Sequence, residues 1–552
     1  MALAEDIRAL VDHACDCGLV RRPDRVWAYN SVLEAVGAKG PGPGDDWVLS
    51  ERYAFPPIAP DVAGVDGDVA LPARAEAPRE GVPCGDVQDE GFDLEGTLGR
   101  ISEAAVANGI ADDTASGRDR VAMRVMGLLV PRPSEVMRRF EDALAWDGPR
   151  AATDWFYKLC CDAGYVRRAA IARNIGWVTS TRWGDLEITI NRSKPEKDPR
   201  EIAAAGAAPV SGEAYPACQL CVENEGYPGR AAASPGGAHP ARQNLRIVPI
   251  ELGGERWGLQ YSPYAYFAEH CIAMSCHHRH MHVDRKALAC LLDFVDLLPQ
   301  YFVGSNADLP VVGGSILSHD HFQGGRHEFP MMRARVTEGF SMGGFPGVSG
   351  EVLEWPLSVL RLRGQDRQEL LEAGGHVIDR WRAHTDASVG VFATTSDGVA
   401  HNTVTPVVRK LEDEGAYELY LALRCNVASA RHPLGDFHPH EQWHHIKREN
   451  IGLIEVMGLA ILPPRLVGEL GAVRDHLLAG DLDALDSDPL SAPHAAWARE
   501  RLVGRDGLTA EGADGLIREE VGIVFGHVLE DAGVFKWDEA GREALDLFLG
   551  SL

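Results

Sequence analysis

The sequence predicts an α+β protein in which a β-rich body is flanked by helical N- and C-terminal regions. Residues 1–40 and 94–156 place apolar side chains at helical spacing, and the pattern is helical again from about residue 441 to residue 552. Between them lie short runs rich in β-branched and aromatic residues, separated by Gly, Pro and Asp, which is typical of strands.

The N-terminal region begins with helices. Ile7, Leu10 and Val11 fall on one helical face, and Gly37 with Gly40 ends the pattern. Residues 41–92 are rich in Gly, Pro, Ala and Asp with little periodicity, so we interpret them as a loop excursion. We therefore expect a helical region with a Gly/Pro-rich excursion over residues 1–150.

The β-rich body begins at GDLEITIN, residues 184–191, which alternates apolar and polar side chains as a half-buried strand does. Further strand-like runs are 244–252, 270–275, 309–317, 389–395 and 416–424. Strand-bearing segments before and after about residue 345 suggest a diverged duplication, although no sequence repeat is visible. We expect an N-terminal catalytic half over 151–345, a C-terminal half over 346–465 and a helical region over 466–552.

Composition excludes several classes of protein. The 552 residues carry 54 Lys and Arg against 81 Asp and Glu, a net charge of −27, which argues against a nucleic-acid partner bound through whole-molecule charge. No apolar run is long enough for a membrane span, and the acidic, amphipathic N-terminus is unlike a signal peptide, so we expect a cytoplasmic protein without a membrane partner. The 11 cysteines do not indicate a disulfide framework.

The strongest chemical signal is residues 304–325, GSNADLPVVGGSILSHDHFQGG. We expect the β-branched run to lead as a strand into His319, His321 and Gln323. Side chains two residues apart on a strand share a face, at a spacing of about 7 Å, so these three would share one face while Phe322 points toward the core.

This arrangement suits a phosphate site. A neutral imidazole is a good nucleophile near pH 7, so one His would attack phosphorus, the other would orient or ligate, and the carboxamide would donate to a phosphoryl oxygen. Paired glycines would let backbone amides approach the anion closely. These are Gly313, Gly314, Gly324 and Gly325. The alternative is a pair of structural histidines at a strand end.

A second signal is Cys218-Gln-Leu-Cys221. This spacing binds zinc through two thiolates, but a zinc site needs two more ligands. The alternative is a pair of reduced, buried thiols.

Residues 305–325 resemble the active-site signature of the class II galactose-1-phosphate uridylyltransferases, the bacterial UDP-glucose:hexose-1-phosphate uridylyltransferases. Further stretches similar to this family are 152–159, 184–199, 215–230, 239–250, 260–271 and 432–466. The resemblance spans most of the chain, and a motif of more than 15 residues is far more specific than a short pattern. It implies a histidine-triad-like fold, with an antiparallel sheet body and two related halves.

The resemblance also implies a ping-pong enzyme of galactose metabolism. His321 would attack the α-phosphorus of UDP-glucose and expel glucose 1-phosphate, and galactose 1-phosphate would then take the uridylyl group to give UDP-galactose. Gln323 stands where related hydrolases carry a third His, and an amide cannot deliver a proton to a leaving group. His319 is the third residue of this catalytic set.

The expected substrate contacts come from the motif and from nearby cations. They are Asn306, Gly313, Gly314, Ser315, Gly324, Gly325, Arg242, Arg246 and Lys194. The alternative for each of the three cations is a solvated surface role.

Comparison with the class I relatives implies a structural zinc site made of Cys218, Cys221, His278 and His319. The choice of His278 within the histidine-rich run 277–282 rests on alignment alone. The resemblance implies no organic cofactor, and a homodimer is the expectation for this superfamily.

Two patterns near residue 440 compete with this assignment. His438-Pro-His-Glu-Gln442 imitates the HPHGQ motif of the class I enzymes but has Glu in place of Gly. His440-Glu-Gln-Trp-His444 matches the HExxH zinc-protease pattern, with Glu469 as a third ligand, although so short a pattern arises easily among 21 histidines. We assign the nucleophile to neither pattern.

Two rival functions stay open beside the transferase. One is a nucleotide hydrolase or phosphorylase of the same superfamily, and Gln323 argues against the hydrolase. The second is a zinc-stabilised nucleotide-binding protein without turnover.

Overall fold

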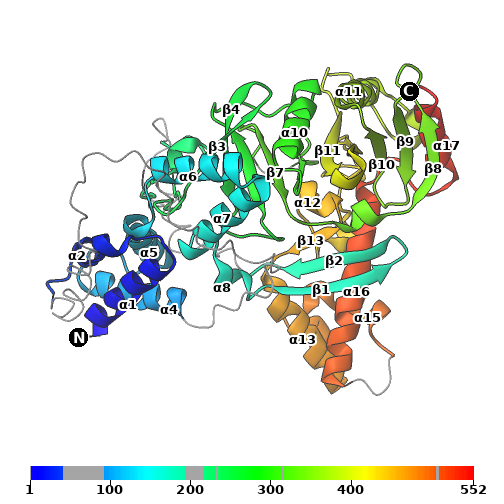
Figure 1. Ribbon diagram of the computed structural model, residues 1–552. Coiled ribbons are helices and arrows are strands. Elements are labelled where there is room, and N and C mark those ends of the chain that lie inside the picture. The colour runs from blue at the N-terminus through cyan, green and yellow to red at the C-terminus, as the bar shows by residue number, and fades with distance from the viewer. Residues whose placement is uncertain are drawn as a thin grey trace, which may run out of the picture.

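The computed structural model describes residues 2–40, 92–192, 215–231, 234, 237–313, 316–504 and 509–552. A ten-stranded sheet forms the body and a three-stranded sheet lies beside it. N-terminal helices gather at one end, most of the C-terminal helices gather on one side of the smaller sheet, and the last helix lies at the edge of the large sheet (Figure 1). The predicted α+β class with helical terminal regions is confirmed.

The N-terminal region is helical, as its apolar periodicity predicts. Its helices are α1 (Ala2–Asp16), α2 (Arg25–Ala35), α4 (Leu94–Ala107), α5 (Ala115–Leu129), α6 (Pro133–Trp146), α7 (Pro149–Asp162) and α8 (Arg168–Ile171). Helix α1 buries the predicted face of Ile7, Leu10 and Val11. The side chains of Asp93 and Thr114 cap α4 and α5 by accepting from backbone amides of the first turn. The predicted excursion lies outside the described residues, apart from Phe92.

The ten-stranded sheet is built from two sets of five strands. The first set comprises β3 (Val248–Leu252), β4 (Glu255–Tyr261), β5 (Cys271–Ser275), helix α10 (Arg285–Leu297), β6 (Phe302–Gly304) and β7 (His321–Gly325). The second comprises β8 (Val336–Ser341), β9 (Val348–Leu353), β10 (Val359–Gly364), helix α11 (Arg367–Ala383), β11 (Asn402–Leu411) and β12 (Ala416–Cys425).

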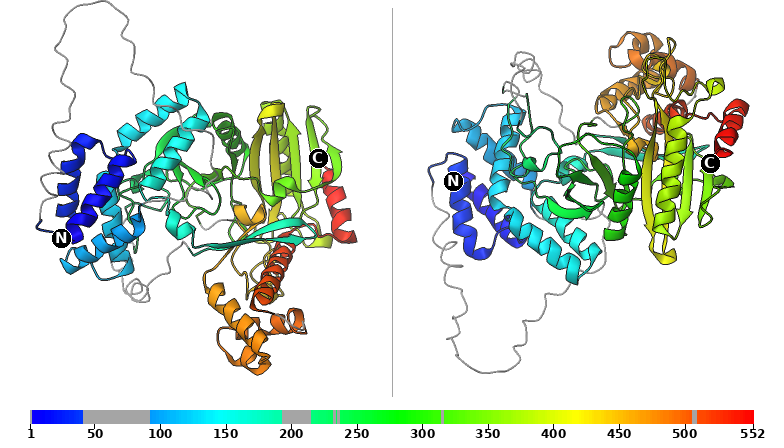
Figure 2. Two further views of the ribbon diagram at one scale, coloured as in Figure 1. Left: turned by 60° about the horizontal axis from the view of Figure 1, so that its bottom comes forward. Right: turned by 90° about the horizontal axis from the view of Figure 1, so that it is seen from above.

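The two sets share one topology. Each has an antiparallel meander of three strands, a helix, and two further strands, of which the last pairs with the third. The order β3-β4-β5-β7-β6 meets β11-β12-β10-β9-β8 where Gly304 of β6 pairs with Val407 of β11. The halves lie side by side in Figure 2. This repeated topology agrees with two related halves.

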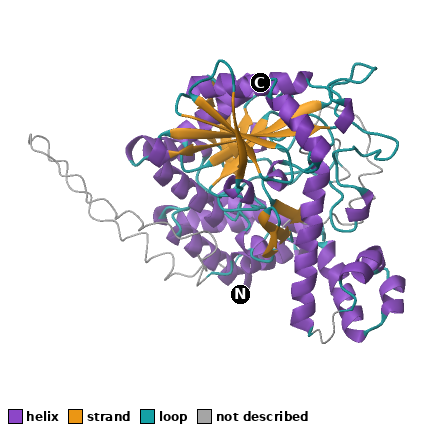
Figure 3. Cartoon of the chain, turned by 90° about the vertical axis from the view of Figure 1, so that its right-hand side faces the viewer, coloured by secondary structure: helices purple, strands orange, loops and turns teal. Residues whose placement is uncertain are grey.

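The smaller sheet comprises β1 (Ile175–Thr181), β2 (Gly184–Ile190) and β13 (Leu459–Leu462), which pairs parallel with β2. The C-terminal helices are α12 (Leu453–Val456), α13 (Arg465–Ala479), α14 (Leu482–Ser487), α15 (Ala495–Arg501), α16 (Ala510–Ala532) and α17 (Glu539–Leu549). Helix α16 crosses β1 and β2 closely, because a Cβ on Gly522 would lie 2.3 Å from Cβ of Thr179. Figure 3 shows both sheets among their helices.

Two expected strands and one expected helical region need correction. In the expected strand 309–317, residues 309–313 form bends, because Pro310 cannot donate to a ladder and Val311 has a φ of 74°. Residues 389–395 follow a short 3-10 helix (Ala387–Val389) and make only isolated bridges, since Gly390 turns the chain with a φ of 73°. The C-terminal region, expected to be helical, contains β13.

Helices α10 and α11 cover one face of the ten-stranded sheet. Phe322 of β7 points to that side and stacks on Trp257 at 4.8 Å between ring centroids, as its position in the motif predicts. A Cβ on Gly324 would lie 3.4 Å from Phe294 of α10. His321 and Gln323 alternate with Phe322 and Gly324 along the strand, so their side chains face away from α10. Among the described residues, no helix combines the length and apolar character that a membrane span requires.

Candidate active site

Strand β7 places His321 and Gln323 on one face. Antiparallel pairing with β5 sets Met274 opposite His321 and Ile272 opposite Gln323. His319 differs from the expectation, because β7 begins only at His321 and His319 lies in the preceding bend. Its side chain instead points to the cysteines Cys218 and Cys221.

The imidazole of His321 has one nitrogen engaged. Nδ1 lies 2.8 Å from the carbonyl oxygen of His319, and a carbonyl can only accept, so Nδ1 carries the proton. Nε2 makes no hydrogen bond to any residue in the described part of the chain. Burial lowers the pKa of His321 to about 4, so the ring is neutral at pH 7. A neutral ring with a fixed Nδ1–H presents the Nε2 lone pair as a nucleophile.

The amide of Gln323 is held by a residue that the sequence analysis did not single out. Nε2 of His270 lies 3.0 Å from Oε1 of Gln323, so the ring donates and the oxygen accepts. His270 is 2% exposed, and burial lowers its pKa to about 4. The NH2 group of Gln323 then remains available as a donor.

Four side chains from three segments come together as a group that could hold a metal ion. The ligand atoms of Cys218, Cys221, His278 and His319 all lie within 4.8 Å of one another. Sγ of Cys218 is 3.5 Å from Sγ of Cys221 and 3.2 Å from Nδ1 of His319, and Sγ of Cys221 is 3.2 Å from Nδ1 of His278. A tetrahedral ion with bonds of about 2.0–2.3 Å separates its ligand atoms by about 3.3–3.8 Å. The donor set therefore fits a metal ion.

The surroundings of this cluster orient its ligands. Nε2 of His319 donates to the carbonyl oxygen of Ser275 at 2.9 Å, which leaves Nδ1 as the metal-facing atom. The Asn224 amide donates to the carbonyl oxygens of Cys218 and Cys221, both at 2.8 Å, and so fixes the turn between the two thiols.

Asn306 and the two arginines that were expected to contact substrate, Arg242 and Arg246, make different kinds of contact. Oδ1 of Asn306 accepts from the amide of Leu453 at 2.9 Å, so its NH2 group is the end left for a ligand. Arg246 donates to the carbonyl oxygens of Val130, Pro131, Gln243 and Leu245, so its guanidinium ties the body to the end of α5. Arg242 is buried, with its guanidinium 5.7 Å from the centre of the Tyr165 ring.

Backbone packing accounts for the glycines of the motif that the structure describes. A Cβ would lie 2.1 Å from the carbonyl oxygen of Ala307 at Gly313 and 2.5 Å from that of Phe302 at Gly324. Gly325 has a φ of 153°, and its Cβ would lie 2.7 Å from the carbonyl oxygen of Glu269. Three expected substrate contacts, Lys194, Gly314 and Ser315, lie outside the described residues.

The segment 447–456 brings further charged groups near Asn306. Nζ of the buried Lys447 lies 2.7 Å from Oε1 of Glu455. Arg424 of β12, 1% exposed, donates to the carbonyl oxygen of Ile451 at 3.0 Å. Their only signal in the sequence is the family-like stretch 432–466, which includes Lys447 and Glu455.

The protease pattern does not assemble a metal site. Nε2 of His444 contacts the carbonyl oxygen of Pro439, and Nδ1 of His440 lies 3.1 Å from Asp531. Glu469 is instead 2.9 Å from Nε2 of His494. In the ranges that the structure describes, the cluster of Cys218 is the one group of three or more ligand side chains.

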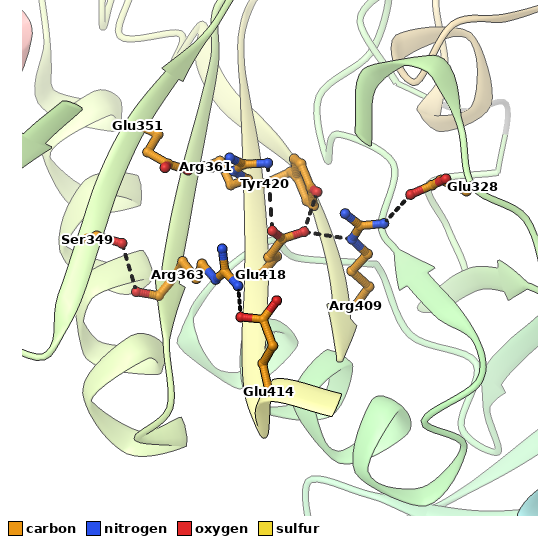
Figure 4. Close-up of polar contacts among 9 residues, drawn as sticks. All are labelled: Glu328, Ser349, Glu351, Arg361, Arg363, Arg409, Glu414, Glu418 and Tyr420. Atoms are coloured by element: carbon orange, nitrogen blue, oxygen red, sulfur yellow. Dashed lines mark hydrogen bonds and ion pairs between the residues drawn. The ribbon is translucent and has the colours of Figure 1, made fainter. Parts of the chain in front are cut away.

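The second half has no histidine on the strand that takes the place of β7. Strand β12 carries Glu418 and Tyr420 on one face (Figure 4). Leu419 between them lies against α11, since a Cβ on Gly374 would lie 2.4 Å from its side chain, so Glu418 and Tyr420 face away from α11. Glu418 is 3% exposed and accepts from Tyr420 Oη and Arg409 Nε, both at 2.6 Å, with Arg361 at 3.6 Å. The second half therefore fills this face with a buried ion cluster.

Fold and site together define a two-half α+β protein with one strand-borne histidine site beside a Cys2His2 cluster. The family model "Galactose-1-phosphate uridyl transferase, N-terminal domain" matches residues 94–280, and the model of the C-terminal domain matches residues 294–499. The chain belongs to the galactose-1-phosphate uridyl transferase family.

Individual relatives extend this similarity over nearly the whole chain. A galactose-1-phosphate uridylyltransferase of Bacillus subtilis (strain 168) is 41% identical over 553 residues, covering 100% of this chain and 98% of the relative. Another, of Caldanaerobacter subterraneus subsp. tengcongensis, is 46% identical over 484 residues, covering 86% and 91%. Among solved structures, yeast Ap4A phosphorylase Apa2 matches with a TM-score of 0.31 and 12% identity, covering 64% of this chain and 92% of that one.

Proposed function

We propose that the protein is a UDP-glucose:hexose-1-phosphate uridylyltransferase that works through a uridylyl-histidine at His321. The observation that carries the proposal is the hydrogen bond from Nδ1 of His321 to the carbonyl oxygen of His319 at 2.8 Å. It fixes the tautomer whose Nε2 lone pair can attack phosphorus. Membership of the family supports galactose 1-phosphate as a substrate of uridylyl transfer, and the resemblance of residues 305–325 implies UDP-glucose as the donor.

The reaction proceeds in two displacements. Nε2 of His321 forms a bond to the α-phosphorus of UDP-glucose, and the bond from that phosphorus to the bridging oxygen breaks, so glucose 1-phosphate leaves with the electron pair. A phosphate oxygen of galactose 1-phosphate then attacks the same phosphorus, and the P–N bond returns its electron pair to Nε2. The carbonyl oxygen of His319 stabilises the positive charge that the ring carries between the two steps.

Two amides serve the phosphoryl groups in this proposal. The NH2 group of Gln323 donates to a non-bridging oxygen of the α-phosphate, and the NH2 group of Asn306 donates to phosphate or ribose. Neither amide can protonate a leaving group, so these two residues provide no general acid for hydrolysis of the intermediate by water. This favours a transferase over a hydrolase of similar fold.

We further propose that Cys218, Cys221, His278 and His319 hold a zinc ion. Two thiolates and two imidazoles at tetrahedral separations suit zinc, and a closed site with four protein ligands is structural. The ion would fix the segment from His319 to His321. A homodimer and a cytoplasmic location remain predictions from the sequence.

Isotope exchange tests the two-step reaction. The enzyme is incubated with UDP-glucose and radiolabelled glucose 1-phosphate in the absence of galactose 1-phosphate. Two displacements predict that label enters UDP-glucose, because the first displacement reverses without the second substrate. No exchange, in a preparation that forms UDP-galactose when both substrates are present, would show direct transfer. Formation of UDP from UDP-glucose and inorganic phosphate, with no UDP-galactose formed from galactose 1-phosphate, would instead favour a phosphorylase.

A further inference from the structure

We propose that His270 is a positioning residue of this reaction, which holds the amide of Gln323 so that its NH2 group, and not its oxygen, faces the phosphoryl group. The inference rests on the proposed function and adds to it the residue that sets the polarity of the phosphate contact. His270 lies 53 residues before Gln323 in the chain, directly before strand β5.

The contacts of His270 fix its ring. The ring centroid lies 4.5 Å from that of Phe267 and 5.5 Å from that of Tyr266. Nε2 lies 3.0 Å from Oε1 of Gln323, while Nδ1 is buried and has no hydrogen-bond partner among the described residues. The ring thus has one polar contact, and that contact is to the amide.

The polarity of the amide matters because phosphoryl oxygens only accept hydrogen bonds. A glutamine amide can turn over and exchange its donor for its acceptor at little cost unless a neighbour distinguishes its two ends. A ring with its proton on Nε2 can only donate at that atom, so the oxygen end of the amide must face it. The opposite tautomer would bury an unpaired Nδ1–H and turn Oε1 toward the negative phosphate, and both changes are unfavourable.

Protonation does not change this arrangement near pH 7. Burial lowers the pKa of His270 to about 4, so the ring is neutral and carries a single proton. His270 does not touch the reacting atoms in this account. It acts through Gln323, as outer residues orient the ligands of metal and oxyanion sites.

Replacement by Met and by Gln separates positioning from packing. The two side chains have similar volume, but only Gln can donate near the place of Nε2. We expect His270→Met to slow uridylyl transfer to His321 by about 10- to 100-fold, the range found for lost orienting contacts. We expect His270→Gln to recover most of that rate. The rate is measured by rapid quench with UDP-glucose and intact mass, and His270→Leu replaces the Met variant if the latter does not fold.

A double-mutant cycle with Gln323→Met gives the readout that a merely structural role would not move. If His270 acts only through the amide, then His270→Met costs about nothing further once Gln323 is Met. His384→Met is the matched control, because this histidine also packs between aromatic rings and has a buried, unpartnered nitrogen. It lies in the second half, and we expect wild-type transfer rates from it.

Three results would overturn the proposal: transfer by His270→Met within twofold of wild type, equal losses in the Met and Gln variants, or additive losses in the cycle. Failure of the proposed function looks different. In that case wild-type protein forms no uridylyl adduct at all, whereas failure of this inference alone leaves the wild-type adduct intact.

Discussion

His319 and His321 are joined by a hydrogen bond that connects the cluster of Cys218, Cys221, His278 and His319 to the imidazole that we propose as the nucleophile. The carbonyl oxygen of His319 accepts from Nδ1 of His321 at 2.8 Å, while Nδ1 of the same His319 lies 3.2 Å from Sγ of Cys218. His319 therefore contacts the cluster through its side chain and the ring of His321 through its backbone carbonyl. Loss of the cluster should therefore disturb the ring of His321 through the three-residue segment from His319 to His321.

Metal removal is the first prediction. We expect Cys218→Ser to lower the rate of uridylyl transfer to His321 by about 10- to 100-fold, because the carbonyl that orients the ring loses its support. Dialysis against a strong chelator should have the same effect and lower the melting temperature. Cys290→Ser is the control, since Cys290 is a buried free thiol on α10 outside the cluster. Equal rates in Cys218→Ser and Cys290→Ser would contradict the connection.

The second prediction concerns which histidine completes the cluster. His278 and His280 are both exposed, but only His278 places Nδ1 near the thiols, 3.2 Å from Sγ of Cys221. We expect His278→Ala to lose most of the bound zinc and His280→Ala to keep about one ion per chain. Elemental analysis of the purified variants measures this directly. Zinc retained in His278→Ala and lost in His280→Ala would assign the ligand to the other histidine.

The buried cluster of the second half gives a stability prediction. Glu418→Gln removes the buried carboxylate that Arg409 and Arg361 share, while Glu328 and Glu351 still pair with them. We therefore expect a loss of about 1–3 kcal/mol in the free energy of unfolding. Glu414→Gln, which removes an exposed ion pair with Arg363, should cost less than about 1 kcal/mol. Urea unfolding compares the two. Similar midpoints would show that the Glu418 cluster contributes little.

Acid should destabilise the fold below about pH 6.5. Burial, with a smaller contribution from His494, lowers the pKa of His445 to about 3, and burial lowers that of His270 to about 4. In the unfolded chain both titrate near 6.5, so below that pH the unfolded state binds protons that the native state does not. The free energy of unfolding therefore decreases as the pH is lowered, by at most about 1.4 kcal/mol per pH unit for each histidine, until the pH reaches the pKa of that histidine in the folded state.

Urea midpoints at pH 7, 6 and 5 test this dependence. We expect His445→Gln to reduce the slope between pH 6.5 and 4, because it removes one of the groups that titrate only on unfolding. An unchanged slope in His445→Gln would show that this histidine is not held neutral in the native state.

The sequence correctly predicts that His321 and Gln323 share one face of a strand, because strand alternation is local. It misplaces His319, since Pro310 and the left-handed Val311 break the expected strand and β7 begins two residues after His319. His270 could not be found, because its contact with Gln323 depends on the pairing of β5 with β7. The Glu418 cluster is equally hidden, because all ten residues of β12 are buried and the strand has no exposed face to reveal its register.

The most direct test of the account is the covalent intermediate itself. Purified protein is incubated with UDP-glucose, quenched without acid and examined by intact mass, beside a His321→Gly variant. We expect a uridylyl adduct on the wild type that is absent from the variant and is discharged by galactose 1-phosphate. No adduct on wild-type protein that still binds UDP-glucose, or an adduct that persists in His321→Gly, would contradict it.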